Sequence, residues 1–100
     1  MDNREIIEKL TRYKALVAEH FDLEMLILFG SHAKGTAKED SDIDVAVVVS
    51  KTNTDFGDYA PLLWRLRRQV DSRIEPVLIE KENDPSGFLQ EIIKTGQIIN

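Results

Sequence analysis

The sequence predicts an α+β fold in which a small mixed β-sheet carries helices mainly on one of its faces. Short apolar runs that suit strands alternate with longer stretches in which apolar residues recur every three or four positions. The chain contains neither G-x-G-x-x-G nor a Walker sequence, the motifs that mark the common nucleotide-binding folds. The order of elements would also fit a small doubly wound domain, and that alternative stays open at this point.

The first element is a helix, expected from Asn3 to about His20. Its apolar residues recur at spacings of three and four, which places them along one side of a helix. They are Ile6, Ile7, Leu10, Tyr13, Leu16, Val17 and Phe21. This stripe predicts that the helix packs one face against the sheet.

Three strands are expected, over Glu24–Phe29, Ile43–Val49 and Ile74–Ile79. The first ends in consecutive apolar residues and is followed by a glycine, which is typical of a strand buried on both faces. The second is rich in valine. The third contains Pro76, which cannot donate a hydrogen bond to a neighbouring strand, so we expect this strand at an edge of the sheet or with a bulge.

A second long helix is expected from about Asp58 to Val70, after a polar loop over residues 51–57. Its inward side is formed by apolar residues at helical spacing, namely Leu62, Leu63, Leu66 and Val70. Trp64 and Arg67 fall outside this stripe. The pattern therefore predicts that Trp64 is partly exposed.

The last helix is expected over about Ser86–Thr95, and Gly96 is expected to end it. Gln97–Asn100 then forms a short apolar tail. Its Ile98-Ile99 pair suits either a surface that docks a partner or a short edge strand.

The bulk properties predict one globular domain, spanning residues 1–100. A hydrophobic share of 42% and a charged share of 31% are those of a folded chain rather than a disordered one. The chain has no cysteine, which excludes disulfides and thiolate chemistry. It also has no apolar segment that resembles a membrane span or a signal peptide. We therefore expect a cytoplasmic protein that does not enter a membrane.

The net charge of −5 disfavours long nucleic acid as a partner, because the protein's field would repel phosphates. A cluster of arginines is the exception to this acidic character. Its members are Arg65, Arg67, Arg68 and Arg73. Arginines on and after one helix usually form a solvated face, and we interpret the cluster in this way.

The turn after the first strand has the sequence GSHAKG, over residues 30–35. Gly30 allows a sharp backbone turn because it lacks a Cβ atom. Ser31 suits the cap of a short helical turn, and free N–H groups at such a start favour an anion. We expect His32 and Lys34 to face solvent. Alone, this turn would more often be a plain loop than a phosphate site.

Two carboxylates open the second strand. Because side chains alternate along a strand, Asp42 and Asp44 point to the same side. Two like charges so close repel each other unless a cation lies between them, and oxygen ligands completed by phosphate and water suit Mg²⁺. Alone, this pair could be a solvated strand end. The glycine turn and the carboxylate pair together predict a site for a nucleoside triphosphate and Mg²⁺.

The motifs G-S-x-A-x-G over residues 30–35 and S-D-I-D over residues 41–44 resemble those of the minimal nucleotidyltransferases of the DNA polymerase beta-like superfamily. The resemblance covers about residues 23–80. It implies the nucleotidyltransferase fold, an α+β arrangement with the site at one edge of the sheet. The family also implies that Gly30 and Ser31 bind the triphosphate and that Asp42 and Asp44 bind metal.

The family further implies a third carboxylate on the next strand, which completes the metal site and helps to activate the attacking hydroxyl. Glu75 stands where the family usually shows an aspartate, and Asp71 is the competing candidate. Glutamate is longer by one methylene, and Glu75 could instead be a solvated charge at the start of the strand. Our hypothesis is that Glu75 is the third carboxylate.

The resemblance implies Mg²⁺-dependent transfer of a nucleoside monophosphate, with AMP from ATP as the expected case, to a hydroxyl acceptor. Minimal nucleotidyltransferases are often paired with a small helical HEPN protein in toxin–antitoxin modules. The chain is therefore expected to be an antitoxin that adenylylates or masks its partner, with Trp64 and Ile98-Ile99 as candidate docking features. The alternatives are an inactive module that binds nucleotide or partner, and transfer to a small molecule such as an aminoglycoside.

Overall fold

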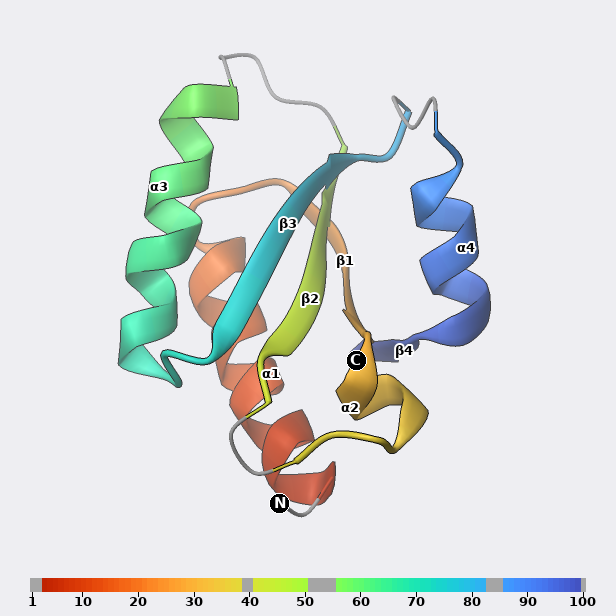
Figure 1. The fold of residues 1–100 in the computed structure, drawn as a ribbon. Coiled ribbons are helices and arrows are strands. Elements are labelled where there is room, and N and C mark those ends of the chain that lie inside the picture. Colours follow the sequence, from red (N-terminus) through yellow and green to blue (C-terminus); the bar gives the residue numbers. More distant parts are fainter. Residues whose placement is uncertain (1–2, 39–40, 51–55, 83–85, 100) are drawn as a thin grey trace.

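The computed structural model describes residues 3–38, 41–50, 56–82 and 86–99, and it describes the side chains from Arg4 onward outside the α3 segment 56–60. The chain follows an alternating order of helices and strands (Figure 1). The elements are α1 (Asn3–Ala18), β1 (Leu23–Phe29), α2 (Ser31–Lys34), β2 (Ile43–Val49), α3 (Phe56–Leu66), the 3₁₀ helix η1 (Arg67–Gln69), β3 (Ile74–Glu80), α4 (Phe88–Thr95) and β4 (Gln97–Ile99).

The sheet is mixed, with strand order β3-β2-β1-β4. β1 runs antiparallel to β2 and to β4, whereas β2 and β3 are parallel. The predicted α+β class is therefore confirmed, and the doubly wound alternative is wrong because β1 is antiparallel to both of its neighbours, whereas a doubly wound sheet is mostly parallel. β3 lies at an edge of the sheet, as Pro76 predicted.

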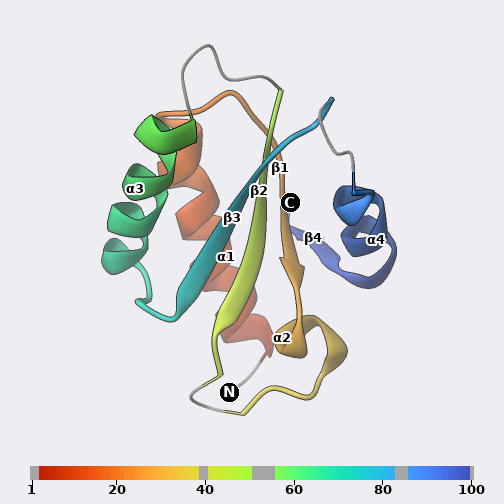
Figure 2. The same ribbon diagram turned by 45° about the horizontal axis from the view of Figure 1, so that its top comes forward.

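The helices form unequal layers on the sheet. α1 and α3 cover one face, and α4 lies alone on the other (Figures 1 and 2). The first layer contains the larger core cluster, with Leu10, Tyr13, Leu28, Val47 and Ile74 among its members. A smaller cluster lies under α4 and consists of Ile27, Ala46, Val48, Ile79, Leu89 and Ile92. None of the helices in the described ranges is long and apolar enough to cross a membrane.

α1 uses its predicted stripe to cover the sheet. Ile6, Leu10 and Val17 are fully buried, and Ile7 and Leu16 pack at the margin. The Tyr13 hydroxyl donates a hydrogen bond of 2.9 Å to the carbonyl of Leu63, which ties α1 to α3. Burial raises the pKa of the Tyr13 hydroxyl, so it stays protonated and remains a donor.

The second long helix differs from its predicted bounds. α3 begins at Phe56 and ends at Leu66, and the chain then tightens into η1. Trp64 is 40% exposed, as predicted. Its ring contacts the guanidinium of Arg67, one helical turn further along the chain.

The C-terminal tail is the short edge strand β4, one of the two outcomes foreseen for it. Ile98 is 44% exposed, but Ile99 is 2% exposed and belongs to the larger core cluster. The Nζ atom of Lys14 also holds the Ile99 carbonyl at 3.1 Å. The expectation that Ile99 forms part of a docking surface is therefore wrong, and Ile98 alone remains exposed.

At Gly96, where α4 ends, the backbone passes close to neighbouring carbonyl groups and does not adopt a left-handed turn. Its φ of −95° and ψ of −173° are those of extended backbone. A Cβ atom at this position would lie 2.6 Å from the carbonyl oxygens of both Ile92 and Leu28. The glycine therefore lets the chain pass directly from α4 into the β4–β1 pairing.

Candidate active site

The strand register brings the predicted site residues together at one end of the sheet. Asp44 is paired with Phe29 of β1 on one side and with Glu75 of β3 on the other. Asp42 immediately precedes β2. The starts of β2 and β3 and the turn after β1 therefore meet next to α2 (Figure 1).

Gly30 fits closely against Asp44. Its φ of 76° lies in the left-handed region, which side chains rarely adopt. A Cβ atom at Gly30 would also collide with the Asp44 carboxylate. A glycine is therefore required here by the backbone and by the position of the carboxylate, which rests directly on the turn.

Ser31 does not cap α2, contrary to the expectation from the sequence. Gly30 is the N-cap residue, and no side chain caps the helix. The Lys34 N–H donates to the Gly30 carbonyl at 3.1 Å, and the Thr36 N–H donates to the Ser31 carbonyl at 3.0 Å. The Ser31 hydroxyl is thus not committed to stabilising its own helix.

His32 is half-buried, so it faces solvent only in part. Its Nε2 atom lies 3.4 Å from the Ser41 carbonyl. It also lies close enough to Asp44 to lower the pKa of that carboxyl. His32 therefore links α2 to the approach to β2, whereas Lys34 is exposed as predicted.

The loop over residues 36–41, between α2 and β2, is described only in part. Residues 39–40 lie outside the described ranges. The Lys38 N–H donates to the Ser41 hydroxyl at 2.8 Å, and the Ser41 N–H donates to the Lys38 carbonyl at 3.1 Å. Lys38 and Ser41 are therefore joined by two hydrogen bonds just before Asp42.

The carboxyl groups of Asp44 and Glu75 both have raised pKa values. Burial, followed by the charge of Asp42, raises the pKa of Asp44. Burial also raises the pKa of Glu75, and the charges of both aspartates add to this effect. The charge of Asp42 thus acts on both Asp44 and Glu75. This end of the sheet therefore concentrates negative charge that a cation would relieve.

The donor set suits Mg²⁺ held jointly with a phosphate ligand. Within the described ranges, no group of three or more His, Cys, Asp or Glu side chains forms a metal cage by itself. Mg²⁺ usually takes one or two protein carboxylates and completes its shell with phosphate and water. Asp42 and Asp44 supply these two carboxylates.

Asp71, the competing candidate for the third carboxylate, belongs to a structural network. Its Oδ2 atom lies 2.8 Å from Lys9 Nζ and 2.6 Å from Arg73 Nη2. Hydrogen bonds from Arg73, with a further one from Lys9, hold the pKa of Asp71 well below its usual range. Glu75 is therefore the candidate that the fold places beside Asp44.

The arginine cluster is only partly a solvated face. Arg65 and Arg68 are exposed, but Arg73 pairs with Asp71 and Arg67 is half-buried. Arg67 also lies close enough to Glu75 to oppose the rise in its pKa. The sequence did not single out Arg67 as a site residue; its spacing of three residues from Trp64 was the available signal.

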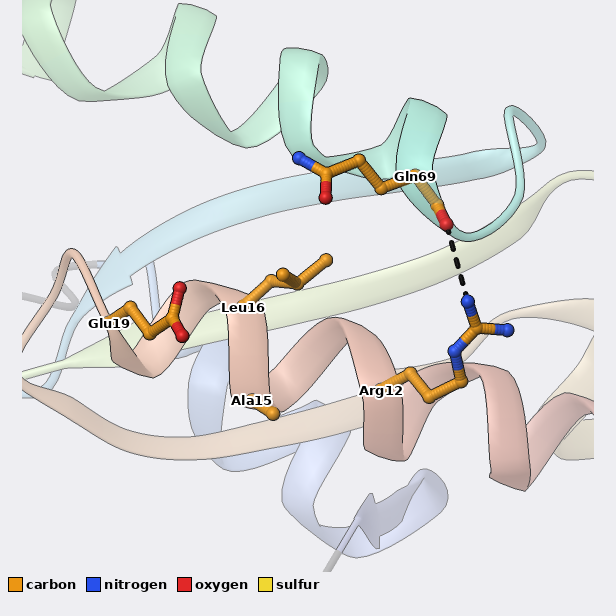
Figure 3. A pocket seen from close by; sticks show the side chains of 5 residues that line it. All are labelled: Arg12, Ala15, Leu16, Glu19 and Gln69. Carbon is orange, nitrogen blue, oxygen red and sulfur yellow. Dashed lines mark hydrogen bonds between the residues drawn. The ribbon is translucent and has the colours of Figure 1, made fainter.

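A surface pocket of about 270 Å³ lies away from these carboxylates, between α1 and the end of the α3–η1 segment (Figure 3). It is lined by Arg12, Ala15, Leu16, Glu19 and Gln69. Arg12 Nη2 reaches the Gln69 carbonyl across it at 3.5 Å. Because α1 covers the other face of the sheet, this pocket is separate from the candidate active site.

Comparison with known families gives a match over residues 8–100 to the family described as polymerase beta, nucleotidyltransferase. Two similar proteins of Methanocaldococcus jannaschii are provisionally named protein adenylyltransferases. One is 30% identical over 92% of this chain and 96% of its own length. The other is 29% identical over 94% of this chain and 93% of its own length. The protein adenylyltransferase MntA of Shewanella oneidensis is 28% identical over 75% of this chain and 52% of its own length.

Solved structures share the fold. A provisionally named nucleotidyltransferase of Sulfolobus solfataricus has a TM-score of 0.72 at 19% identity, covering 96% of this chain and 80% of that one. A toxin–antitoxin structure with AMP-PNP contains a chain with a TM-score of 0.63 at 25% identity, covering 100% of this chain and 73% of that one. A complex of a tri-AMPylated Shewanella oneidensis HEPN toxin with its MNT antitoxin gives a TM-score of 0.62 at 22% identity, covering 96% and 71%.

Proposed function

Because the chain belongs to the polymerase beta nucleotidyltransferase family, we propose that it transfers AMP from ATP to a hydroxyl group on a partner protein. The observation that carries this proposal is the meeting of Asp42, Asp44 and Glu75 at one sheet end, against the Gly30 turn. Carboxylates and a phosphate-binding turn are the parts that this chemistry needs.

In the proposed complex, Asp42 and Asp44 would hold Mg²⁺ on the triphosphate, and Glu75 would complete the metal site. When bound, Mg²⁺ neutralises phosphate charge and orients the α-phosphoryl group for in-line attack. Gly30 and Ser31 contact the phosphates that leave, through a backbone N–H and the uncommitted hydroxyl. Because the Asp44 carboxylate lies directly against Gly30, the proposed metal-binding and phosphate-binding residues are in direct contact.

The proposed reaction forms one bond and breaks one. The acceptor oxygen bonds to the α-phosphorus as the bond from that phosphorus to the bridging oxygen breaks, and pyrophosphate leaves. The hydroxyl proton passes to the Glu75 carboxylate and then to solvent. Glu75 is paired with Asp44 in the strand register, which places its carboxylate where it can take that proton. Most of the catalysis is positioning and charge stabilisation.

We further propose a HEPN-type protein as the acceptor, with this chain as the antitoxin-like member of the pair. The relatives' name, protein adenylyltransferase, supports a protein as acceptor, and the AMPylated HEPN toxin in a structural neighbour supports this kind of partner. Long nucleic acid is not proposed, because the chain carries a net charge of −5. A cytoplasmic location belongs to the proposal, since the reaction consumes ATP.

The test uses ATP labelled at the α-phosphate, Mg²⁺ and a purified HEPN-type protein of the source organism. We expect label on that protein with the wild type and none with Asp44→Asn, which keeps the size of the side chain. Asp22→Asn is the matched control, because Asp22 is exposed outside the carboxylate cluster. It should transfer like the wild type.

Retained transfer by Asp44→Asn would contradict the proposed site. Label on a small molecule instead of the protein would support the aminoglycoside-type alternative. Absence of label with all four nucleotides, combined with Mg²⁺-dependent nucleotide binding, would support the inactive binding module.

A further inference from the structure

Arg67 is bound to the start of β3, the strand that carries Glu75. Its Nη1 atom donates a hydrogen bond of 3.0 Å to the Ile74 carbonyl. β3 is an edge strand, so alternate backbone groups along it have no strand neighbour to bond with. The Ile74 N–H also bonds outside the sheet, to the Asp71 carbonyl at 3.1 Å. Arg67 thus supplies the donor that an edge carbonyl would otherwise lack.

The same short segment is fixed from the sheet side. The Ile43 N–H of β2 donates to the Arg73 carbonyl at 2.9 Å. Ile43 stands between Asp42 and Asp44, and Arg73 lies two residues before Glu75. The backbone next to Glu75 is therefore held between β2, which carries Asp44, and the Arg67 side chain.

The guanidinium of Arg67 is itself held in place. Its Cζ atom lies 4.3 Å from the centre of the Trp64 ring, a cation–π contact across one helical turn. Tyr13 lies close enough for the positive charge to act on its pKa. The partly exposed Trp64 ring therefore packs on the Arg67 guanidinium and helps to fix its position.

Within the described ranges, the charge of Arg67 is not cancelled by an ion pair with a nearby carboxylate. Its Nε atom is buried and has no hydrogen-bond partner in that part of the chain. Burying part of a guanidinium removes water from a charged group, which costs free energy. One hydrogen bond to a carbonyl offsets this cost only in part. Glu75 directly follows Ile74, and the charge of Arg67 opposes the rise in the pKa of Glu75 that burial and the two aspartates cause.

We propose that Arg67 is a positioning residue that holds the start of β3 through the Ile74 carbonyl, so that the carboxylate of Glu75 completes the cluster. The proposal rests on the function proposed above only for the role of Glu75 in transfer. It explains how a glutamate, one methylene longer than the aspartate usual in the family, is kept beside Asp44.

The test is a double-mutant cycle between Arg67 and Glu75. Arg67→Met removes the hydrogen bond and the charge but keeps most of the side-chain length. Glu75→Gln removes the carboxylate, and Arg68→Met is the matched control on the adjacent exposed arginine. The measurements are Mn²⁺ affinity by electron paramagnetic resonance, kcat and KM for labelled transfer, and the unfolding midpoint.

We expect Arg67→Met to lower kcat and Mn²⁺ affinity by about ten- to a hundred-fold, the usual effect of removing a group that orients a metal ligand. KM for the acceptor should stay unchanged. In the Glu75→Gln background, Arg67→Met should cause no further loss. Arg67→Lys should recover part of the affinity, and Arg68→Met should match the wild type.

An equal loss from Arg67→Met with and without the Glu75 carboxylate would overturn the proposal and make Arg67 a structural residue. Equal behaviour of Arg67→Met and Arg68→Met would also overturn it. If Arg67→Met does not fold by circular dichroism, Arg67→Lys enters the same cycle and decides by the same criterion. If the wild type transfers no label, the proposed function fails, while the cycle on Mn²⁺ affinity still tests Arg67.

Discussion

The two faces of the sheet are built for different purposes. The face under α1 and α3 is covered along its length, and Leu28, Val45, Val47 and Ile74 on it are fully buried. On the opposite face α4 covers only the part around Ile27 and Val48. The rest of that face carries Asp44 and Glu75. It also carries Val77, two residues after Glu75 on β3, whose side chain is 40% exposed.

This difference shows how so small a chain can bear a charged site. The closed face supplies apolar burial, the dominant favourable contribution to folding. The half-open face then carries mutually repelling carboxylates at positions where the neighbouring residues Phe29 and Glu75 are fixed by the strand register. We therefore expect closed-face substitutions to change stability, and substitutions around the carboxylates to change ligand binding and transfer.

The largest expected change in stability follows from Leu28→Ala on the closed face. Leu28 is fully buried, so its truncation should lower the free energy of unfolding by about 2–5 kcal/mol. Urea denaturation measures the change. Val77→Ala on the half-open face is the control and should cost much less, because that side chain is 40% exposed. Equal costs would contradict the distinction between the faces.

Gly30→Ala should damage both stability and function. The positive φ alone should cost about 1–3 kcal/mol, and the new Cβ would push the Asp44 carboxylate away. Gly35→Ala separates these effects, because Gly35 has a φ of 74° with no atom near its Cβ position. We expect similar destabilisation by both substitutions but loss of labelled transfer only in Gly30→Ala. Equal transfer by the two variants would show that the contact between the Asp44 carboxylate and Gly30 is not needed for transfer.

Asp71→Asn should give the smallest effect, and a pH-dependent one. Because hydrogen bonds from Arg73 and Lys9 lower the pKa of Asp71 in the folded state, its stabilising contribution is fully present above the unfolded value near 3.9. That contribution is lost as the pH falls toward the folded pKa. At pH 7 the substitution should cost about 1–2 kcal/mol, and the difference from wild type should shrink below about pH 4. A difference independent of pH would contradict the assignment.

The sequence predicted those parts of the fold whose signals are local. An apolar run followed by glycine predicted β1 and its turn, valines predicted β2, and Pro76 predicted the edge position of β3. The period of two along a strand was enough to place the carboxylates of Asp42 and Asp44 together at the start of β2.

What the sequence did not reveal depends on which elements meet in space. Ile99 is buried because β4 pairs with β1 under α1, a contact between opposite ends of the chain. His32 is half-buried because the chain returns past it at Ser41. Arg67 contacts the Ile74 carbonyl at the start of β3, because η1 ends next to that strand. Local patterns contain no information on these long-range contacts.

The most direct test of the central claim is the unfolding midpoint of wild type and Asp44→Asn, each with and without Mg²⁺ and AMP-PNP. Without ligand, Asp44→Asn should be at least as stable as the wild type, because it removes the repulsion from Asp42. Adding Mg²⁺ and AMP-PNP should raise the midpoint of the wild type and leave that of Asp44→Asn unchanged. An equal rise in both proteins would show that these carboxylates do not bind the metal–nucleotide complex.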